Sequence, residues 1–384
     1  MNETLNKKSI YFPSLNGIRF IAAVLVFLHH FVAIDYVRKN IGFSMEGSFL
    51  SPMGGTGVTL FFVLSGYLIT YLLLTEYKIE NKISIKDFYI RRLLRIWPLY
   101  FLTIAINLLY AYFSSTLTPD FFTTRLILYT FFLPNVASIL FISGGFPTQL
   151  WSVGSEEQFY LFWPWVIKLF RKKIKIILIS IPVVFFVMRF LLYFLISYKE
   201  PVFFKGINVL DFFNQFINNF RVDCMVIGAC FATLLFYKHK FLDVFYSKIA
   251  QVIAMFLIIA LILFGFNTPV INYPIYSFLF GIIILNLSSN KLSLFNLKHR
   301  LFEELGKISY GLYVFHPFVL LLTDKYIKKF TFNSSIGLTL MFVISFGLTI
   351  LLSYLSFRFF ESPFLKLKHK FSKIISGNEA QQAA

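Results

Sequence analysis

The chain has 384 residues, of which 58% are hydrophobic and only 14% are charged, a composition too apolar for a soluble protein. Phenylalanine alone supplies 52 residues, and apolar runs such as 174–188 and 336–357 approach or exceed the length that crosses a bilayer. The formal net charge of +18 comes from Lys and Arg residues in short clusters between these runs, so it indicates membrane topology rather than nucleic-acid binding.

Ten apolar windows predict membrane-spanning helices, and the expected fold class is an all-α polytopic membrane protein. The windows are 18–34, 57–75, 96–113, 157–170, 174–197, 217–236, 249–266, 270–287, 308–323 and 336–357. A further apolar stretch, 126–142, is ambiguous because Pro134 and Asn135 interrupt its middle.

The distribution of charge favours a topology in which 126–142 does not cross. With a cytoplasmic N-terminus, 23 Lys and Arg residues then lie on the cytoplasmic side and 8 on the opposite side, in agreement with the positive-inside rule. We therefore expect 114–156 to be one extracytoplasmic segment with a re-entrant or interfacial part. The chain divides into a cytoplasmic segment 1–16, a membrane domain 17–363 and a basic, polar cytoplasmic tail 364–384.

Ionisable side chains inside spans are costly and are treated as functional hypotheses. In the first span Arg19 and His30 are eleven residues apart, which puts them on one helix face about 16 Å from each other, with His29 pointing about 80° away. An imidazole kept neutral by burial is suited to general-base work. The alternative is a histidine satisfied by an interhelical hydrogen bond, with Arg19 reaching the lipid headgroups.

Two carboxylates, Glu156 and Glu157, open the fourth span within segment 151–160. A serine cap with one acidic residue in the first turn is ordinary helix-start chemistry. Two carboxylates that enter the membrane together each require a cation or a hydrogen-bond donor, which favours a functional role for at least one of them.

Three further places carry charge. Arg91, Arg92 and Arg95 stand at the cytoplasmic entry to the third span, where guanidinium groups suit phosphate oxygens but also serve as topology signals. Arg221 and Asp223 begin the sixth span and could form an ion pair that anchors helices. His316, beside Pro317 in the ninth span, is a weaker candidate.

Taken together and in this order, these segments resemble the bacterial acyltransferase-3 family of integral membrane O-acyltransferases, which modify cell-surface glycans. Arg19, ten intervening residues and His30 look like the family's first signature, and many members carry aspartate where this chain has Thr59. The similar segments are 15–30, 55–70, 88–95, 151–160, 221–228 and 309–317.

The resemblance implies a bacterial inner-membrane enzyme that transfers an acyl group, expected to be acetyl from acetyl-CoA, to a hydroxyl of a glycan or lipid-linked saccharide. It implies no permanently bound cofactor and no nucleic-acid partner. Membrane lipids are expected to surround the protein. Arg91, Arg92 and Arg95 would bind the coenzyme A phosphates. His30, Arg19 and Glu156 would be catalytic, with Glu156 on the acceptor side. The expected acceptor-binding residues are Trp151, Ser152, Arg221, Asp223 and His316.

The competing hypothesis is a transporter or flippase of lipid-linked sugars, which also needs many spans and buried charges. Such proteins often contain related halves with paired broken helices. No internal repeat of that kind is visible in this sequence.

The two cysteines, Cys224 and Cys230, lie in one apolar run with no base nearby, and no serine elbow is present. The sequence therefore indicates direct transfer of the acyl group rather than a covalent enzyme intermediate.

Overall fold

The protein is described by a computed structural model, which covers residues 9–10, 12, 14–34, 37, 49–117, 122–140, 147–204, 207–327, 334–372 and 374–376. Most of the expected N-terminal segment and the end of the expected tail lie outside the described residues. The described chain is almost entirely helical, as predicted, with four strands of two residues each. The division into three regions stays a prediction.

Ten long helices coincide with the ten predicted windows. They are α1 (Leu15–Ala33), α3 (Met53–Glu80), α4 (Ile85–Phe113), α7 (Trp151–Phe170), α8 (Ile174–Tyr198), α10 (Val222–Phe236), α12 (Lys248–Leu263), α13 (Asn272–Ser289), α15 (Ser309–Ile327) and α16 (Ser334–Leu355).

Shorter elements connect them. The helices are α5 (Phe122–Thr130), α6 (Pro134–Leu140), η1 (Thr148–Leu150), η2 (Arg171–Lys173), α9 (Val209–Phe220), α11 (Phe241–Tyr246), α14 (Arg300–Lys307), η3 (Ser356–Glu361), α17 (Ser362–Lys368) and η4 (His369–Phe371). The strands are β1 (Ser9–Ile10), β2 (Phe203–Phe204), β3 (Ile207–Asn208) and β4 (Ile375–Ser376).

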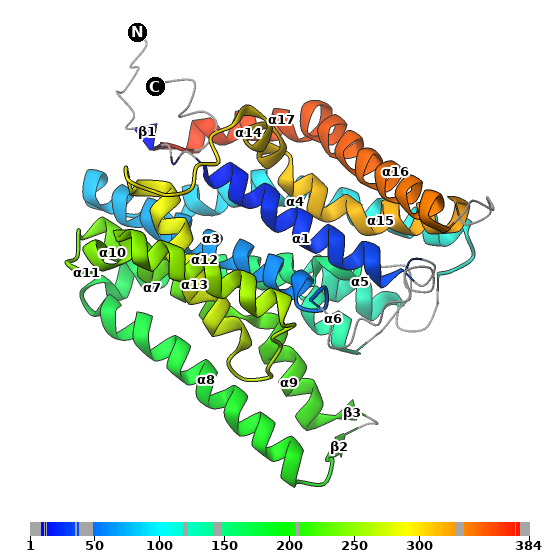
Figure 1. Cartoon of the computed structure of the whole chain (residues 1–384), viewed down its shortest axis with the longest axis horizontal. Helices are drawn as coiled ribbons and strands as arrows, with labels where there is room; N and C mark the ends of the chain where they lie inside the picture. Colours follow the sequence, from blue (N-terminus) through cyan, green and yellow to red (C-terminus); the bar gives the residue numbers. More distant parts are fainter. Residues whose placement is uncertain are drawn as a thin grey trace.

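The predicted count of about ten crossings is not confirmed. Among the described residues, six helical segments are long and apolar enough to cross a bilayer, and a seventh qualifies if α14 and α15, which meet at 67°, form one broken span. β1 pairs in parallel with β4, so the described residues nearest the two ends of the chain lie side by side. The region is at the top of Figure 1, where β1 is labelled. If β1 and β4 lie on one side of a membrane, the number of crossings between them is even.

The ambiguous stretch 126–142 does not form a single spanning helix. It is divided between α5 and α6, of nine and seven residues, and the break includes Phe132 with a positive φ of 57°. Neither helix approaches the roughly 20 residues that span the hydrocarbon core. The expectation that this segment lies on the extracytoplasmic side of the membrane stays a prediction.

Helix α3 is the centre of the bundle, where it packs against α10, α1, α13 and α7. Its closest neighbour is α10, because Gly66 and Gly228 face each other's helix. A Cβ at Gly66 would lie 1.8 Å from the Met225 carbonyl oxygen, and one at Gly228 would lie 2.0 Å from that of Val63. Small residues allow such backbone approach between membrane helices.

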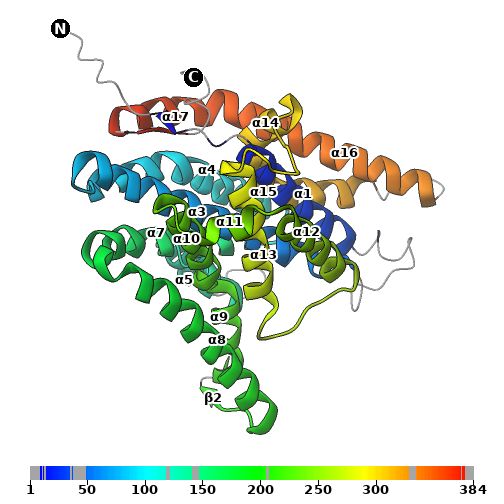
Figure 2. The same cartoon turned by 60° about the vertical axis from the view of Figure 1, so that its left-hand side comes forward.

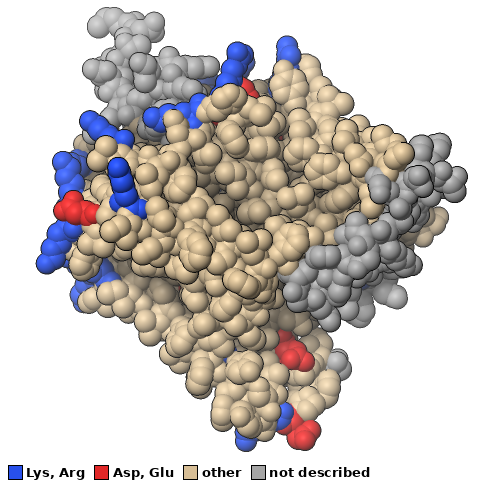
Figure 3. Space-filling view, in the orientation of Figure 1, with Lys and Arg blue, Asp and Glu red and all other residues tan. Residues whose placement is uncertain are grey.

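The outer surface has the character of a lipid-facing belt. Helix α8 and the β2–β3 hairpin project from the bundle in both views (Figures 1 and 2), and in α8 only Ile174, Leu178 and Arg189 are buried. Lys and Arg side chains gather along the edge of the molecule nearest the termini, while the broad middle of the same face carries none (Figure 3).

Asp223 forms an ion pair with a residue that the sequence analysis did not single out. Arg189 in α8 donates from Nη1 and Nη2 to the two carboxylate oxygens of Asp223, at 2.6 and 2.9 Å, and both side chains are almost fully buried. The role of Asp223 in binding the acceptor stays a prediction, and in the structure its carboxylate holds α8 against α10.

We expect Asp223→Asn to reduce the free energy of unfolding by about 3–5 kcal/mol, because it leaves the Arg189 guanidinium buried without its counter-ion. The midpoint of thermal unfolding in detergent would report the loss. Glu304→Gln is the matched control, since Glu304 pairs with Lys307 at 2.7 Å on the exposed surface and such pairs contribute little. Equal effects from the two variants would contradict the structural role assigned to the buried pair.

Candidate active site

Two cavities contain nearly all the predicted site residues. The first, which we call the arginine cavity, has a volume of about 260 Å³. Its polar lining includes Asn16, Arg19, Ser65, Glu76, Arg91, Arg92, Arg95, Ser152, Glu156, Tyr160, Tyr313 and Glu361. The second, the histidine cavity, has a volume of about 270 Å³ and is lined by residues that include His29, His30, Gln149, Trp151, Arg221, Tyr273 and Tyr313.

The two cavities lie toward opposite ends of α1 and share one lining side chain. Arg19, near the start of α1, lines the arginine cavity, and His30, near its end, lines the histidine cavity. Tyr313 lines both. The residues that border the arginine cavity also include Ile10, Ser372 and Ile374, so the paired segments β1 and β4 lie at its lining.

The hydrogen bonds of His30 determine which ring nitrogen is free. Its Nδ1 lies 2.9 Å from the carbonyl oxygen of Val26, and a carbonyl can only accept, so Nδ1 carries the proton. The remaining nitrogen, Nε2, then holds a lone pair, which is what a general base requires. The tautomer needed for proton abstraction is thus set within α1 itself.

His316 contacts His30 and does not line either cavity. Its Nδ1 lies 3.2 Å from the Leu312 carbonyl oxygen, which leaves Nε2 to accept from Nδ1 of His30 at 3.3 Å. The ring is fully buried. The contact of His316 with the acceptor stays a prediction; in the structure its ring is hydrogen-bonded to that of His30.

His29 lines the same cavity as His30, whereas the helical spacing predicted that it points away. The reason is the start of α3, which approaches the end of α1 so closely that a Cβ on Gly54 would lie 2.5 Å from the His29 ring. The Nδ1 of His29 faces the Leu50 carbonyl oxygen at 3.2 Å. Among the described residues, the histidines form no group that could hold a metal ion.

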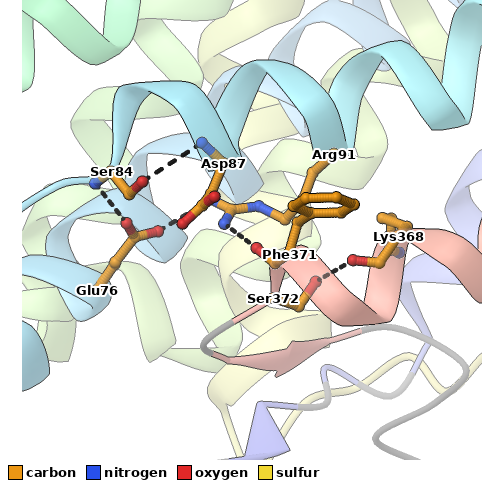
Figure 4. A network of polar contacts seen from close by, with 7 residues as sticks. All are labelled: Glu76, Ser84, Asp87, Arg91, Lys368, Phe371 and Ser372. Atoms are coloured by element: carbon orange, nitrogen blue, oxygen red, sulfur yellow. Dashed lines mark hydrogen bonds and ion pairs between the residues drawn. The ribbon is translucent and has the colours of Figure 1, made fainter.

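Arg91 is held by protein groups (Figure 4). It donates from Nη2 to Glu76 at 2.9 Å and from Nη1 to the Phe371 carbonyl oxygen at 2.8 Å, so it ties the α3–α4 hairpin to the C-terminal segment. Glu76 also accepts from the backbone of Ser84. The predicted phosphate-binding role of Arg91 therefore competes with two structural bonds.

Among the described residues, Arg92 and Arg95 have fewer hydrogen-bond and ion-pair partners than Arg91 has. The Arg92 guanidinium lies 5.7 and 5.6 Å from the ring centroids of Phe88 and Tyr160, and its buried Nε has no hydrogen-bond partner. Arg95 lines the same cavity. These two side chains are the ones that an anionic ligand could recruit.

The side chain of Arg19 is held by the side-chain amide of Asn16. It donates from Nη1 to Oδ1 of Asn16 at 2.7 Å, and Asn16 donates in turn to Glu303 at 2.8 Å. The predicted sharing of a helix face with His30 does not bring them together, because Arg19 belongs to the arginine cavity.

Glu156 also lines the arginine cavity, whereas Arg221 lines the histidine cavity, and the expected place of Glu156 on the acceptor side stays a prediction. It accepts a hydrogen bond from the Tyr160 hydroxyl, which also contacts Ser65. The reason lies in α7, which begins at Trp151: Glu156 is more than one turn into the helix and faces α3 and α4. Glu157 instead accepts from the indole of Trp97 at 2.9 Å.

Consecutive residues at the start of α7 reach both cavities. Trp151 lines the histidine cavity, whereas Ser152 lines the arginine cavity and its Oγ lies 2.6 Å from the hydroxyl of Tyr313. Tyr313 also donates to the Gln149 carbonyl oxygen at 2.9 Å. The side chain at the junction of the cavities is thus held by the turn that precedes α7.

Arg221 lines the histidine cavity, and its acceptor role stays a prediction. It is the residue between α9 and α10, with a positive φ of 41°, and its Nη1 donates to the Gly55 carbonyl oxygen at 3.1 Å. Its guanidinium lies 3.5 Å from the ring centroid of Tyr273 and 5.1 Å from that of Trp151.

Sequence reasoning missed Tyr313, Tyr273 and Glu361. Tyr313 lies within segment 309–317, so its motif was noticed but its place between two cavities was not. Tyr273 opens α13 with no charged or motif residue to mark it. Glu361, at the end of η3, lies four residues beyond the tenth predicted span, 336–357, and reaches the arginine cavity because the chain returns to it.

Comparison with known proteins gives an independent observation. A family model described as an acyltransferase domain matches residues 12–358. The chain is 32% identical to the peptidoglycan O-acetyltransferase OatA of Listeria monocytogenes over 189 residues, which is 46% of this chain and 27% of that protein.

It is also 27% identical over 392 residues to a protein of Staphylococcus aureus (strain COL) named "Putative O-acetyltransferase", covering 94% of this chain and 59% of that protein. The chain thus spans less than two thirds of the length of these relatives. No solved structure matches.

Proposed function

Because the chain belongs to the acyltransferase-3 family, we propose that it is a membrane O-acetyltransferase that moves an acetyl group from acetyl-CoA to a sugar hydroxyl of an envelope glycan. Peptidoglycan is the first acceptor to test, because OatA of Listeria monocytogenes carries that substrate in its name.

The observation that carries this proposal is the meeting of two chemically different cavities at Tyr313. One is rich in guanidinium groups and suits a polyanionic donor. The other presents the unprotonated nitrogen of His30 and suits a hydroxyl acceptor. A group-transfer enzyme with substrates on two sides of a membrane requires this arrangement.

The donor would lie in the arginine cavity. Arg92, Arg95 and Arg19 offer guanidinium donors for the coenzyme A phosphates, and the thioester end would extend toward Ser152 and Tyr313. Arg91 would hold the cavity's wall rather than the ligand, because its donors are used by Glu76 and Phe371.

His30 would then act as the general base. As the acceptor oxygen forms its bond to the thioester carbonyl carbon, Nε2 of His30 takes the hydroxyl proton, and its Nδ1 proton stays hydrogen-bonded to Val26 and His316. The carbon–sulfur bond breaks, and the coenzyme A thiolate leaves and takes up that proton. The products are an acetyl ester and free coenzyme A.

Purified full-length protein in lipid discs tests the proposal. Release of coenzyme A from acetyl-CoA, followed by liquid chromatography, is expected only when peptidoglycan fragments are present, with the acetyl group found on the glycan by mass spectrometry. Chromatography avoids interference from the free thiols of Cys224 and Cys230. A transporter or flippase without transferase activity would release no coenzyme A.

We expect the histidine cavity to open on the extracytoplasmic side. Asn267 is an exposed residue that lines this cavity, whereas Lys82 is exposed in the α3–α4 turn near the other one. A cysteine at Asn267 should react with a membrane-impermeant thiol reagent in intact cells, and a cysteine at Lys82 only after the membrane is opened.

The parent protein, whose own two cysteines lie in α10, is the control for this labelling. The reverse pattern would place the donor cavity outside and contradict the proposed direction of transfer.

A further inference from the structure

Four helices begin at the histidine cavity. They are α3, α7, α10 and α13, and their first residues or caps supply lining residues: Gly54 and Gly55, Trp151, Arg221, and Asn272 with Tyr273. The N-terminus of a helix carries partial positive charge and N–H groups that have no partner within the helix. The cavity therefore has four positive helix ends in its lining, together with the C-terminal ends of α1, near His30, and of α9, at Arg221.

None of these four helix starts is capped by a side chain. Elsewhere the protein does use such caps: Ser84 caps α4 and Asn208 caps α9. Asp223 is the only acidic residue in any of the four first turns, and Arg189 neutralises it. The donors at the cavity are thus left for something other than these side chains.

Arg221 adds a full positive charge to the same place, although only 4% of its surface is exposed. Its Nε and Nη1 donate to neutral oxygens of Asn218, Gly55 and Thr59. Among the described residues, no protein acceptor bonds to its Nη2 and no carboxylate pairs with it.

The described lining of the histidine cavity contains no aspartate or glutamate. The arginine cavity differs, because Glu76, Glu156 and Glu361 offset its guanidinium groups. A buried cation without a counter-ion is costly, and helix starts are favourable sites for anions. A negatively charged ligand in the histidine cavity would therefore offset the charge of Arg221, which no carboxylate of the described lining does.

We propose that the histidine cavity binds an anionic group of the acceptor saccharide, a carboxylate or a phosphate ester. The group would accept from Nη2 of Arg221 and from the free N–H groups at the start of α3. The rings of Trp151 and Tyr273 hold the guanidinium in place, and His30, which lines the same cavity, takes the proton of the acceptor hydroxyl. Naming this ligand as the acceptor rests on the proposed function, whereas anion binding does not.

Binding to the purified protein in lipid discs, without acetyl-CoA, tests the inference by isothermal titration. Glucuronate, glucose 1-phosphate and inorganic phosphate are compared with glucose. We expect at least one anionic saccharide to bind 10-fold or more tightly than glucose. Glucuronate alone would identify a carboxylate, and glucose 1-phosphate with inorganic phosphate would identify a phosphate. Equal binding of glucose and both anionic sugars, or binding of none, would overturn the proposal.

Gly55 offers a sharp variant. A Cβ there would lie 3.8 Å from Nη1 of Arg221 and 3.4 Å from the Tyr273 ring, in ordinary contact. Gly55→Asp would place a carboxylate beside Arg221 at a helix start that favours it. It should lower anion affinity about 10- to 100-fold, as expected for losing hydrogen bonds to a charged group.

Gly55→Asn, of the same shape and without charge, is the matched control and should retain most of the affinity. Arg221→Gln should lose it as Gly55→Asp does, and Arg358→Gln, exposed and outside both cavities, should not. Acetyl-CoA binding, in the other cavity, verifies that each variant is folded. Equal affinities for Gly55→Asp and Gly55→Asn would show that charge at Arg221 does not hold the ligand.

The outcome is separable from that of the transferase proposal. Anion binding that depends on Arg221, in a protein that never releases coenzyme A, would keep the ligand class and reject acetyl transfer. Coenzyme A release with neutral and anionic saccharides alike would keep acetyl transfer and reject the anion site.

Discussion

Replacing His30 by alanine is expected to lower kcat/KM for acetyl transfer by about 10²- to 10⁴-fold, the usual contribution of a general base. The reason is geometric: His30 lines the histidine cavity and its Nδ1 proton is held by Val26, which leaves Nε2 free to take the hydroxyl proton. Initial rates of coenzyme A release from acetyl-CoA, with saturating acceptor, measure the loss.

His29→Ala is the matched control, since His29 lines the same cavity but has no contact with His316 among the hydrogen bonds of the described residues. We expect it to keep most of the activity. His316→Ala should reduce kcat and alter its dependence on pH while leaving KM for acetyl-CoA unchanged, because His316 acts through His30. Equal losses in His29→Ala and His30→Ala would refute the assignment of His30 as the base.

Arg95→Lys is expected to raise KM for acetyl-CoA by about 10- to 100-fold, because an ammonium group cannot reproduce the two parallel hydrogen bonds that a guanidinium makes to phosphate. The side chain lines the arginine cavity and, among the ion pairs of the described residues, has no carboxylate partner. Kinetics with acetyl-CoA varied at fixed acceptor give the value, and the Lys variant keeps the charge that topology needs.

Arg91→Lys provides the contrast. Its guanidinium is already used by Glu76 and Phe371 (Figure 4), so we expect a lower thermal unfolding midpoint and little change in KM. A normal KM in Arg95→Lys, or a larger increase in Arg91→Lys, would return the cluster to a role in topology alone.

The helices could be predicted from sequence because apolar runs of sufficient length leave the backbone no other way to satisfy its hydrogen bonds in lipid. The windows that overlap α1, α3 and α16 are examples. The number of crossings could not be obtained in the same way. A break such as that at Phe132, or the bend between α14 and α15, depends on the neighbours that cover the exposed backbone.

Within the candidate site, the sequence by itself determined which charged and ionisable side chains to consider. His30, Arg92, Arg95 and Arg221 are costly in a membrane, and this cost makes them visible without a structure. Helical spacing also placed Arg19 and His30 on one face of α1, which is a local property of the chain.

Only the tertiary structure decided which of these residues lie together in one cavity or in direct contact. Periodicity describes one helix, whereas a cavity is formed where several helices meet. Contacts between helices therefore place Glu156 in the arginine cavity, pair Asp223 with Arg189 and bring His316 into contact with His30. The same reason explains why Tyr313 was overlooked. A neutral side chain gains its importance from lying between two cavities, and that position depends on contacts among helices far apart in the chain.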